Sequence, residues 1–138
     1  ICVPYGNRWK GPYSYGTIGA FIRMAREKKA ITLFGDGSLR RTFSHAQDIC
    51  SQIEACADLS QTSAQTYNIA GETFSLRQVA GWIAERFGVR VLQTPWPVRE
   101  TAIESGDTVF DDSKIRALIP APLRFTLREW VATADFNK

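Results

Sequence analysis

The side chains that commonly perform acid–base and nucleophilic chemistry are few in this sequence and are poorly grouped. A Ser–His–acid triad needs a histidine base, and His45 is the single histidine. It lies beside Ser44 and Gln47, whose spacing is typical of a helix capping box. The aspartates are no more frequent than turns and helix starts require, and they are Asp36, Asp48, Asp107, Asp111 and Asp112. The sequence therefore predicts no catalytic residue within this chain.

Metal and cofactor sites also lack their usual patterns. Cys2, Cys50 and Cys56 show no Cys-x-x-Cys spacing, so neither a zinc site nor a disulfide framework is predicted. Cys50 and Cys56 fall in a predicted helix, where we expect them to act as buried, small hydrophobic side chains in a reduced, cytoplasmic environment. The segment Gly35-x-Gly37 is followed by arginines and does not form a Gly-x-Gly-x-x-Gly phosphate loop. We therefore predict no metal and no cofactor bound by this chain alone.

Length and composition favour one globular domain spanning residues 1–138. Hydrophobic residues make up 44% and charged residues 22%, which leaves too much apolar material for disorder. The net charge of +3 is too weak to indicate nucleic-acid binding, but a few arginines in a cleft would suit a small anion such as a nucleotide diphosphate. No apolar run approaches the roughly 20 residues of a membrane span. The strand-like start at Ile1 to Pro4 leads us to expect a fragment of a longer parent protein.

Hydrophobic periodicity and capping signals predict helices that alternate with short strands. The expected helices cover Thr17 to Lys29, a stretch after Ser44 with the apolar stripe Ala46, Ile49, Cys50, Ile53 and Ala57, a stretch from Ser75 to Phe87 ended by Gly88, Asp112 to Leu118, and a last helix capped by Thr126 and Glu129. The expected strands are Ile31 to Phe34, Tyr67 to Ala70, residues 89–93, and Thr108 to Phe110, with a turn at 35–38, a turn at Gly71 and Glu72, and a loop through about residue 106. This order indicates an α/β (α+β) fold.

Four ordered segments carry a resemblance to a known family. Residues 35–49 resemble the Gly-Asp-Gly-x-x-x-Arg-Asp-Phe-x-x-Val-x-Asp signature of the extended short-chain dehydrogenase/reductases, the NAD-dependent epimerase/dehydratase family. Tyr5-Gly6 is similar to the family's Asn-Val-Tyr-Gly-Pro segment, and Tyr67 to Leu76 is similar to Tyr-Asn-Ile-Gly-x-Gly-x-x-x-Ser. Residues 105–107 with 112–114 resemble the Pro-Gly-Asp and Asp-x-Ser-Lys elements. The resemblance covers nearly the whole chain.

This resemblance implies the small C-terminal lobe of such an enzyme, which closes over a nucleotide-diphosphate sugar beside NAD. In the family, NAD is bound by a glycine-rich turn and protons are moved by a Tyr-x-x-x-Lys pair, and both lie upstream of the matching region. No tyrosine here has lysine four positions later. The resemblance thus implies that the cofactor-binding Rossmann lobe is absent from this chain, that the chain alone is not catalytic, and that the parent is a nucleotide-sugar epimerase or dehydratase, similar to UDP-glucose 4-epimerase, that forms a homodimer.

The resemblance also assigns substrate contacts. Arg41 matches the family arginine that contacts the substrate diphosphate, and Arg40 competes for this assignment if the loop register shifts. A guanidinium suits the task because its fork can bond two phosphate oxygens. Asp107 matches a candidate contact to ribose or sugar. The expected role of Asp48 is to stabilise a helix start.

Three positions depart from the family pattern. Val3 stands where many members have an asparagine that faces the diphosphate, Thr42 replaces the usual aspartate, and Glu104 replaces a phosphate-binding arginine. Arg99 is the candidate that could compensate. These changes leave a second hypothesis open, in which the parent is a non-catalytic binding or regulatory protein on the same fold.

Overall fold

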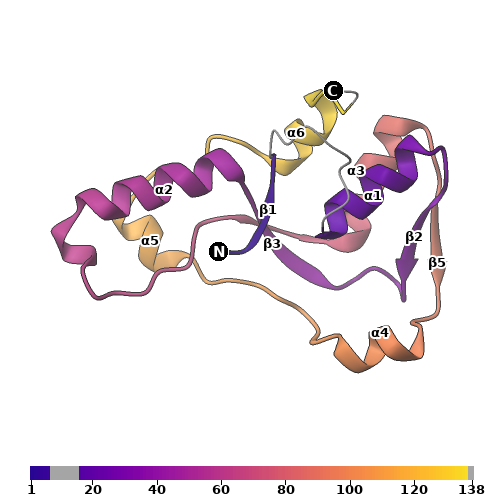
Figure 1. Ribbon diagram of the computed structural model, residues 1–138, viewed down its shortest axis with the longest axis horizontal. Helices are drawn as coiled ribbons and strands as arrows, with labels where there is room; N and C mark the ends of the chain where they lie inside the picture. The colour runs from indigo at the N-terminus through magenta and orange to yellow at the C-terminus, as the bar shows by residue number, and fades with distance from the viewer. Residues whose placement is uncertain (7–15, 137–138) are drawn as a thin grey trace.

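The structure is a computed structural model that describes residues 1–6 and 16–136. Figure 1 shows the order of its elements along the chain. They are β1 (Val3–Tyr5), α1 (Gly16–Arg26), β2 (Ile31–Phe34), β3 (Arg40–His45), α2 (Ala46–Asp58), a 3-10 turn η1 (Ser60–Thr62), β4 (Glu72–Ser75), α3 (Leu76–Phe87), β5 (Val91–Thr94), α4 (Val98–Ile103), α5 (Ser113–Leu118) and α6 (Leu127–Thr133). The mixture of helices and short strands confirms the predicted fold class.

The strands form two small sheets. In the first, β3 is the central strand, parallel to β1 and antiparallel to β4. In the second, β2 pairs in parallel with β5. Because β3 is the middle strand, its backbone pairs with a strand on each side. The family-like motif of residues 35–49 runs along β3 and into α2.

Most of the buried apolar residues form one core between α1, α3, α6 and the strands. Its fully buried members include Ile22 of α1, Ile31 of β2, Phe43 of β3, Ile83 of α3 and Leu127 of α6. Burying each such side chain contributes about 1.5 to 3 kcal/mol. This core fixes β3 and therefore the position of the arginines at its start.

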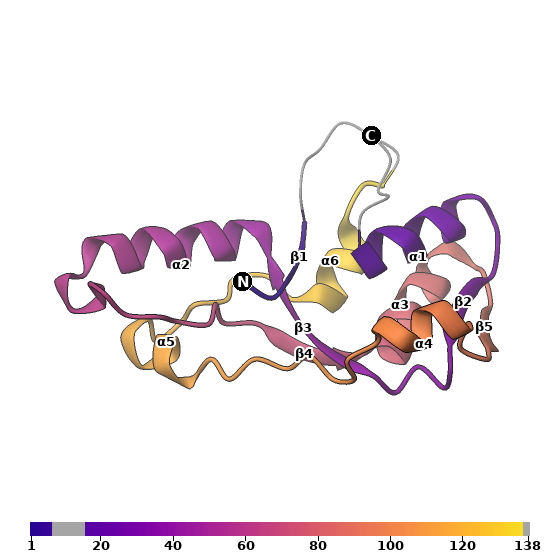
Figure 2. The ribbon, with the colours of Figure 1, turned by 60° about the horizontal axis from the view of Figure 1, so that its bottom comes forward.

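A second, smaller cluster lies at the other end of the molecule. Ile49 of α2, Ile69, Ala70 and Ile115 of α5 form it. In both Figure 1 and Figure 2, α2 and α5 lie together at one end, while α1, α3, β2 and β5 lie at the opposite end. The central sheet joins the two ends.

Several local predictions are confirmed. Strand β2 has the predicted bounds, the turn glycines after it have positive φ, and Ser75 and Gln78 form the predicted capping box of α3. Gly88 ends α3 in the left-handed conformation, and Thr126 caps α6 by accepting a hydrogen bond from the Glu129 amide. These signals are local, so the chain obeys them wherever the tertiary structure does not compete.

The predicted cap at Ser44 is wrong. Strand β3 continues through Ser44, whose hydroxyl donates to the carbonyl of Ala70, and the N-cap of α2 is His45. The predicted strand at Tyr67 to Ala70 is also wrong, because the Ala70 amide donates to the side chain of Gln52 rather than to a strand. The strand forms instead at Glu72–Ser75, so it begins at the second residue of the predicted turn and ends at the predicted helix cap.

Two further differences concern the region after β5. The predicted loop through residue 106 contains the short helix α4, which has no side-chain cap and no buried residue. The predicted strand at Thr108 to Phe110 is reduced to a single parallel bridge between Thr108 and Arg41. Strand β5 begins two residues later than predicted, at Val91, and ends at Thr94 directly before Pro95. Pro97 then serves as the N-cap of α4.

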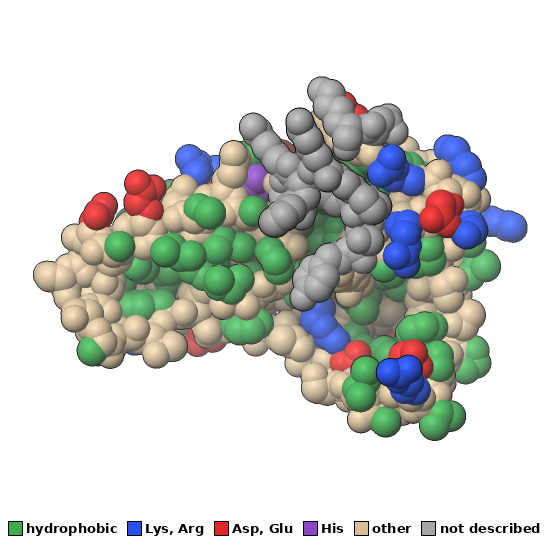
Figure 3. Space-filling model, viewed as in Figure 1, with side chains coloured by type: hydrophobic (Ala, Val, Ile, Leu, Met, Phe, Trp, Pro, Cys, Tyr) green, Lys and Arg blue, Asp and Glu red, His purple; other side chains and the backbone are tan. Residues whose placement is uncertain are grey.

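The apolar stripe predicted for α2 is buried only in part. Ile49 is buried, but Ile53 is 50% exposed and Cys50 is exposed as well, so Cys50 is not the buried cysteine that we predicted. Figure 3 shows hydrophobic side chains gathered along the surface at the α2 end of the molecule. None of the helices described within 1–6 and 16–136 is long and apolar enough to cross a membrane.

Candidate functional site

Arg41 lies on the central strand β3, between Phe74 of β4 on one side and Thr108 on the other. Its guanidinium is half-buried, with 16% of the side chain exposed. Nη1 donates to the carbonyl of Arg40 at 2.9 Å and to the carbonyl of Gly106 at 2.6 Å. These two contacts hold the guanidinium plane in one orientation beside the loop that contains Gly106.

The backbone of Arg40 is hydrogen-bonded to Asp107 and to the residue that follows it. The amide of Arg40 donates to Oδ1 of Asp107 at 2.7 Å, and the amide of Thr108 donates to the carbonyl of Arg40 at 3.0 Å. Both residues are exposed. The carboxylate of Asp107 thus fastens the loop to β3.

Arg99 lies exposed in α4, the helix that leads into the loop. The structure therefore brings Arg41, Arg40 and Asp107 together and places Arg99 in the neighbouring segment.

Glu104 is the site residue whose pairing the sequence did not reveal. Its Oε1 accepts a hydrogen bond from Nη2 of Arg41 at 2.8 Å and another from the amide of Gly106 at 3.0 Å. The signal that could have revealed it is the acid in a position where the family carries an arginine. This signal does not identify the partner, because Glu104 lies 63 residues from Arg41 along the chain.

His45 is built into the fold rather than offered to a ligand. The side chain is 5% exposed and stacks on Phe125 with 4.0 Å between ring centroids, and its Nδ1 accepts a hydrogen bond from the Gln47 amide. Burial lowers the pKa of His45, so the ring stays neutral. Gly6 has φ 80°, and a Cβ there would lie 2.1 Å from Nε2 of His45, which explains why glycine follows Tyr5.

Asp48 is fully buried, and its role is wider than the predicted stabilisation of a helix start. It lies in the first turn of α2, and its Oδ2 accepts hydrogen bonds from the amides of Arg124 and Phe125, both at 3.1 Å. Oδ1 pairs with the side chain of Arg124 at 3.5 Å. The carboxylate thus ties α2 to the segment that precedes α6.

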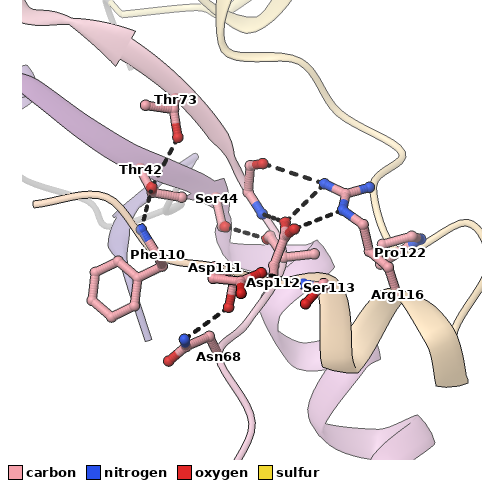
Figure 4. A network of polar contacts seen from close by, with 12 residues as sticks. Thr42, Ser44, Asn68, Thr73, Phe110, Asp111, Asp112, Ser113, Arg116 and Pro122 are labelled. Carbon is pink, nitrogen blue, oxygen red and sulfur yellow. Dashed lines mark hydrogen bonds and ion pairs between the residues drawn. The ribbon is translucent and has the colours of Figure 1, made fainter.

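Thr42, which replaces the family aspartate, is 1% exposed on the next position of β3. Its Oγ1 shares a hydrogen bond with the hydroxyl of Thr73 at 3.0 Å and accepts one from the amide of Phe110 at 3.0 Å. Figure 4 shows these contacts, with Thr42 between β4 and the segment at Phe110. The buried hydroxyl of Thr42 thus holds the segment after Asp107 against the sheet.

The Asp-x-Ser-Lys-like element has a structural role as well. Asp112 accepts a hydrogen bond from the amide of Gly71 at 3.1 Å and forms an ion pair with Arg116 at 2.9 Å, as seen in Figure 4. Burial alone would raise the pKa of Asp112, but the hydrogen bonds and charge of Arg116 and the Gly71 amide hold that pKa below its usual range. Lys114 lies 4.4 Å from the ring centroid of Tyr67. These contacts join α5 to the chain that enters β4.

Metal chemistry has no support in the part of the chain that the structure describes. No group of three or more His, Cys, Asp or Glu side chains within residues 1–6 and 16–136 could hold a metal ion. Positive charge at the candidate site comes from arginines at the start of β3, and the charge of Arg41 is paired with the carboxylate of Glu104.

Comparison with known proteins agrees with the predicted family and fold. The model of the NAD dependent epimerase/dehydratase family matches residues 1–70, and the chain belongs to this family. Residues aligned to dTDP-L-rhamnose 4-epimerase of Burkholderia thailandensis are 31% identical over 93 residues, which is 67% of this chain and 24% of that protein. The chain therefore spans about a quarter of the curated relative that it matches.

Solved structures of epimerases share the same fold. The UDP-glucose 4-epimerase of Thermotoga maritima, solved with UDP-glucose, gives a TM-score of 0.76 at 18% identity and covers 95% of this chain and 41% of its own. The UDP-glucuronic acid 4-epimerase of Bacillus cereus, solved with UDP-glucuronic acid and NAD, gives a TM-score of 0.74 at 21% identity. The match covers 94% of this chain and 40% of that protein. This chain thus has the fold of one part of such proteins.

Proposed function

We propose that this chain is the nucleotide-sugar-binding C-terminal domain of a longer NAD-dependent epimerase, and that it binds the diphosphate of its substrate through Arg41. The observation that carries the proposal is the half-buried guanidinium of Arg41, on the strand that bears the family motif. The carbonyls of Arg40 and Gly106 hold this guanidinium in one orientation. A fixed guanidinium loses little side-chain entropy when it binds two phosphate oxygens. Epimerisation of the sugar would be the activity of the whole parent.

The starts of helices α2 and α3 do not fit NAD. A dinucleotide is held by free amides at the start of a helix after a glycine-rich turn. The cap of α2 is His45 and the cap of α3 is the Ser75–Gln78 box, so these two helix starts are engaged by their own side chains. We therefore assign NAD to the parent outside this chain, and we derive no step of the reaction through it.

Calorimetric titration of the 138-residue chain tests this function. We expect UDP-glucose, UDP-glucuronic acid or dTDP-rhamnose to bind and NAD not to bind. Arg41→Ala should weaken the affinity for the sugar nucleotide by about 10- to 100-fold, which corresponds to the loss of a charge-assisted hydrogen bond. Arg128→Ala removes an exposed arginine of α6 and should change the affinity less than about twofold.

Equal effects of Arg41→Ala and Arg128→Ala would mean that only overall charge matters and that Arg41 is not a phosphate ligand. If the chain binds no sugar nucleotide, the proposal fails for this domain. The second candidate, a parent that binds or regulates without turnover, is favoured by the occupation of Arg41 by Glu104. A parent that interconverts two sugar-nucleotide epimers in the presence of NAD would exclude that candidate.

The cellular setting belongs to the same proposal. We place the parent in the cytoplasm, as a homodimer that acts on free sugar nucleotides. Size-exclusion chromatography with light scattering on the purified parent tests the dimer. A monomer at about micromolar concentration would contradict it.

A further inference from the structure

The guanidinium of Arg41 already holds an anion, and that anion belongs to the chain itself. Nη2 of Arg41 donates to Oε1 of Glu104 at 2.8 Å, and the two side chains are 16% and 23% exposed. Carboxylate and phosphate oxygens accept from an arginine fork with the same geometry. Glu104 therefore occupies the position that a phosphate oxygen would take at Arg41.

A second donor converges on the same oxygen. The amide of Gly106 also donates to Oε1 of Glu104, at 3.0 Å. A side-chain cation and a backbone amide thus point at one oxygen position, which is the arrangement of an anion subsite. Loop and strand geometry would remain if the carboxylate left, because Nη1 of Arg41 is held by the carbonyls of Arg40 and Gly106.

Glu104 can leave without disturbing the hydrophobic core. It is the C-cap of α4, in which no residue is buried, so its side chain can turn toward water without opening the core. The partner arginine is fixed by the sheet. The exchangeable half of the pair is therefore the carboxylate.

We propose that Glu104 is an intramolecular competitor of the ligand diphosphate, and that a phosphate group binds at Arg41 and the Gly106 amide only when Glu104 swings out. This inference rests on the function proposed above and deepens it, because it names the residue that sets the affinity of the site. The apparent dissociation constant equals the intrinsic one divided by the fraction of molecules with the site open. If Glu104 occupies the site about 80 to 90% of the time, binding is weakened about five- to tenfold.

The test is calorimetric titration of the 138-residue chain with UDP, and with uridine as the ligand that lacks phosphate. Glu104→Gln should tighten UDP by about five- to tenfold, because the neutral amide competes poorly for a guanidinium. Glu100→Gln removes the same charge from the first turn of α4 and should change UDP affinity less than about twofold. Uridine affinity should stay the same in both variants.

Two further variants test whether the effect of Glu104 is competition for Arg41 rather than a change in folding or in overall charge. Glu104→Asp keeps the charge but shortens the side chain by one methylene, so we expect UDP to tighten in the same direction even if Glu104→Gln fails to fold. In the Arg41→Ala background, Glu104→Gln should give no tightening, since the shared partner is gone.

The outcomes distinguish the two proposals. If Arg41→Ala weakens UDP while Glu104→Gln and Glu104→Asp leave it unchanged or weaken it, Glu104 is not a competitor and instead positions Arg41, and the proposed function stands. If UDP binds to Glu104→Gln but not to the unaltered chain, the competition is stronger than we expect and the inference holds. If UDP binds to none of these proteins, the proposed function and the inference both fail.

Discussion

Two arginine–carboxylate pairs, both containing a residue of the family motif, are built in opposite ways. In the Asp48–Arg124 pair the carboxylate is fully buried and the arginine side chain is 61% exposed. In the Arg41–Glu104 pair the arginine is the more buried partner, because 16% of its side chain is exposed against 23% for the glutamate. Asp48 is fixed by backbone amides, whereas Arg41 is fixed by backbone carbonyls.

The difference decides which pair can serve a ligand. In the Asp48–Arg124 pair, the arginine is the side chain that could move away into water. The buried carboxylate of Asp48 would then remain, still bound by two backbone amides of the chain. Around Arg41 the exchangeable group is the carboxylate, and the charge left behind is a cation that a phosphate can satisfy. The first pair therefore holds the fold together, and the second has the arrangement on which we base the proposed ligand site.

The largest effect that tests this comparison is the loss of Asp48. Asp48→Ala leaves the amides of Arg124 and Phe125 without their acceptor, so we expect the free energy of unfolding to fall by about 2 to 4 kcal/mol. Asp107→Ala is the matched control, because Asp107 also accepts a backbone amide but is exposed, and it should cost about 0.5 to 1 kcal/mol. Urea unfolding measures both. Equal losses would show that the burial of Asp48 does not matter.

A smaller effect is expected at the second pair. Arg41→Ala removes the contacts to the loop at Gly106 and should lower the free energy of unfolding by about 1 to 2 kcal/mol. Arg124→Ala, at the exposed arginine of the first pair, should cost about 0.5 kcal/mol. Hydrogen exchange should also become faster at the Gly106 amide in Arg41→Ala. A larger loss in Arg124→Ala than in Arg41→Ala would reverse the comparison.

The sequence predicts the local parts of this structure well. Strand β2, the capping box of α3 and the glycine that ends α3 depend on neighbours along the chain, and they form as predicted. The predicted cap at Ser44 failed because tertiary partners compete for its hydroxyl. Cys2 and the carbonyl of Ala70 engage it, and β3 runs on to His45.

The sequence singled out Arg41 as a candidate, but it did not reveal the contacts of Arg41 in the fold. The motif located Arg41, and the structure places Arg40 and Asp107 beside it. The pairing with Glu104 joins positions 63 residues apart through a loop, and no local pattern fixes such a distance. In the same way, Asp112 and Thr42 were visible as motif positions, but their hydrogen bonds to the amides of Gly71 and Phe110 required the tertiary fold.

The smallest effect is a pH dependence at His45, which lies beside the first pair. Burial lowers the folded pKa of His45, the charge of Asp48 opposes this, and the charge of Arg124 adds to it. The unfolded chain, with a histidine pKa of about 6.5, takes up the proton first as the pH falls. The contribution of neutral His45 to stability is therefore complete above about pH 6.5 and is lost as the pH falls toward the folded pKa, by at most about 1.4 kcal/mol per pH unit.

His45→Asn tests this assignment because asparagine keeps an N-cap acceptor for the Gln47 amide but does not titrate. Urea unfolding between about pH 7.5 and about pH 5.5 should show a smaller loss of stability in this variant than in the unaltered chain. Arg124→Ala should also reduce the loss, since removing that cation brings the folded pKa of His45 nearer to its unfolded value. Arg41→Ala, which alters only the second pair, should leave the pH dependence unchanged. A change of slope in Arg41→Ala would mean that the two pairs are electrostatically coupled, and Asp48 and Arg124 could then no longer be treated as structural and separate from the site.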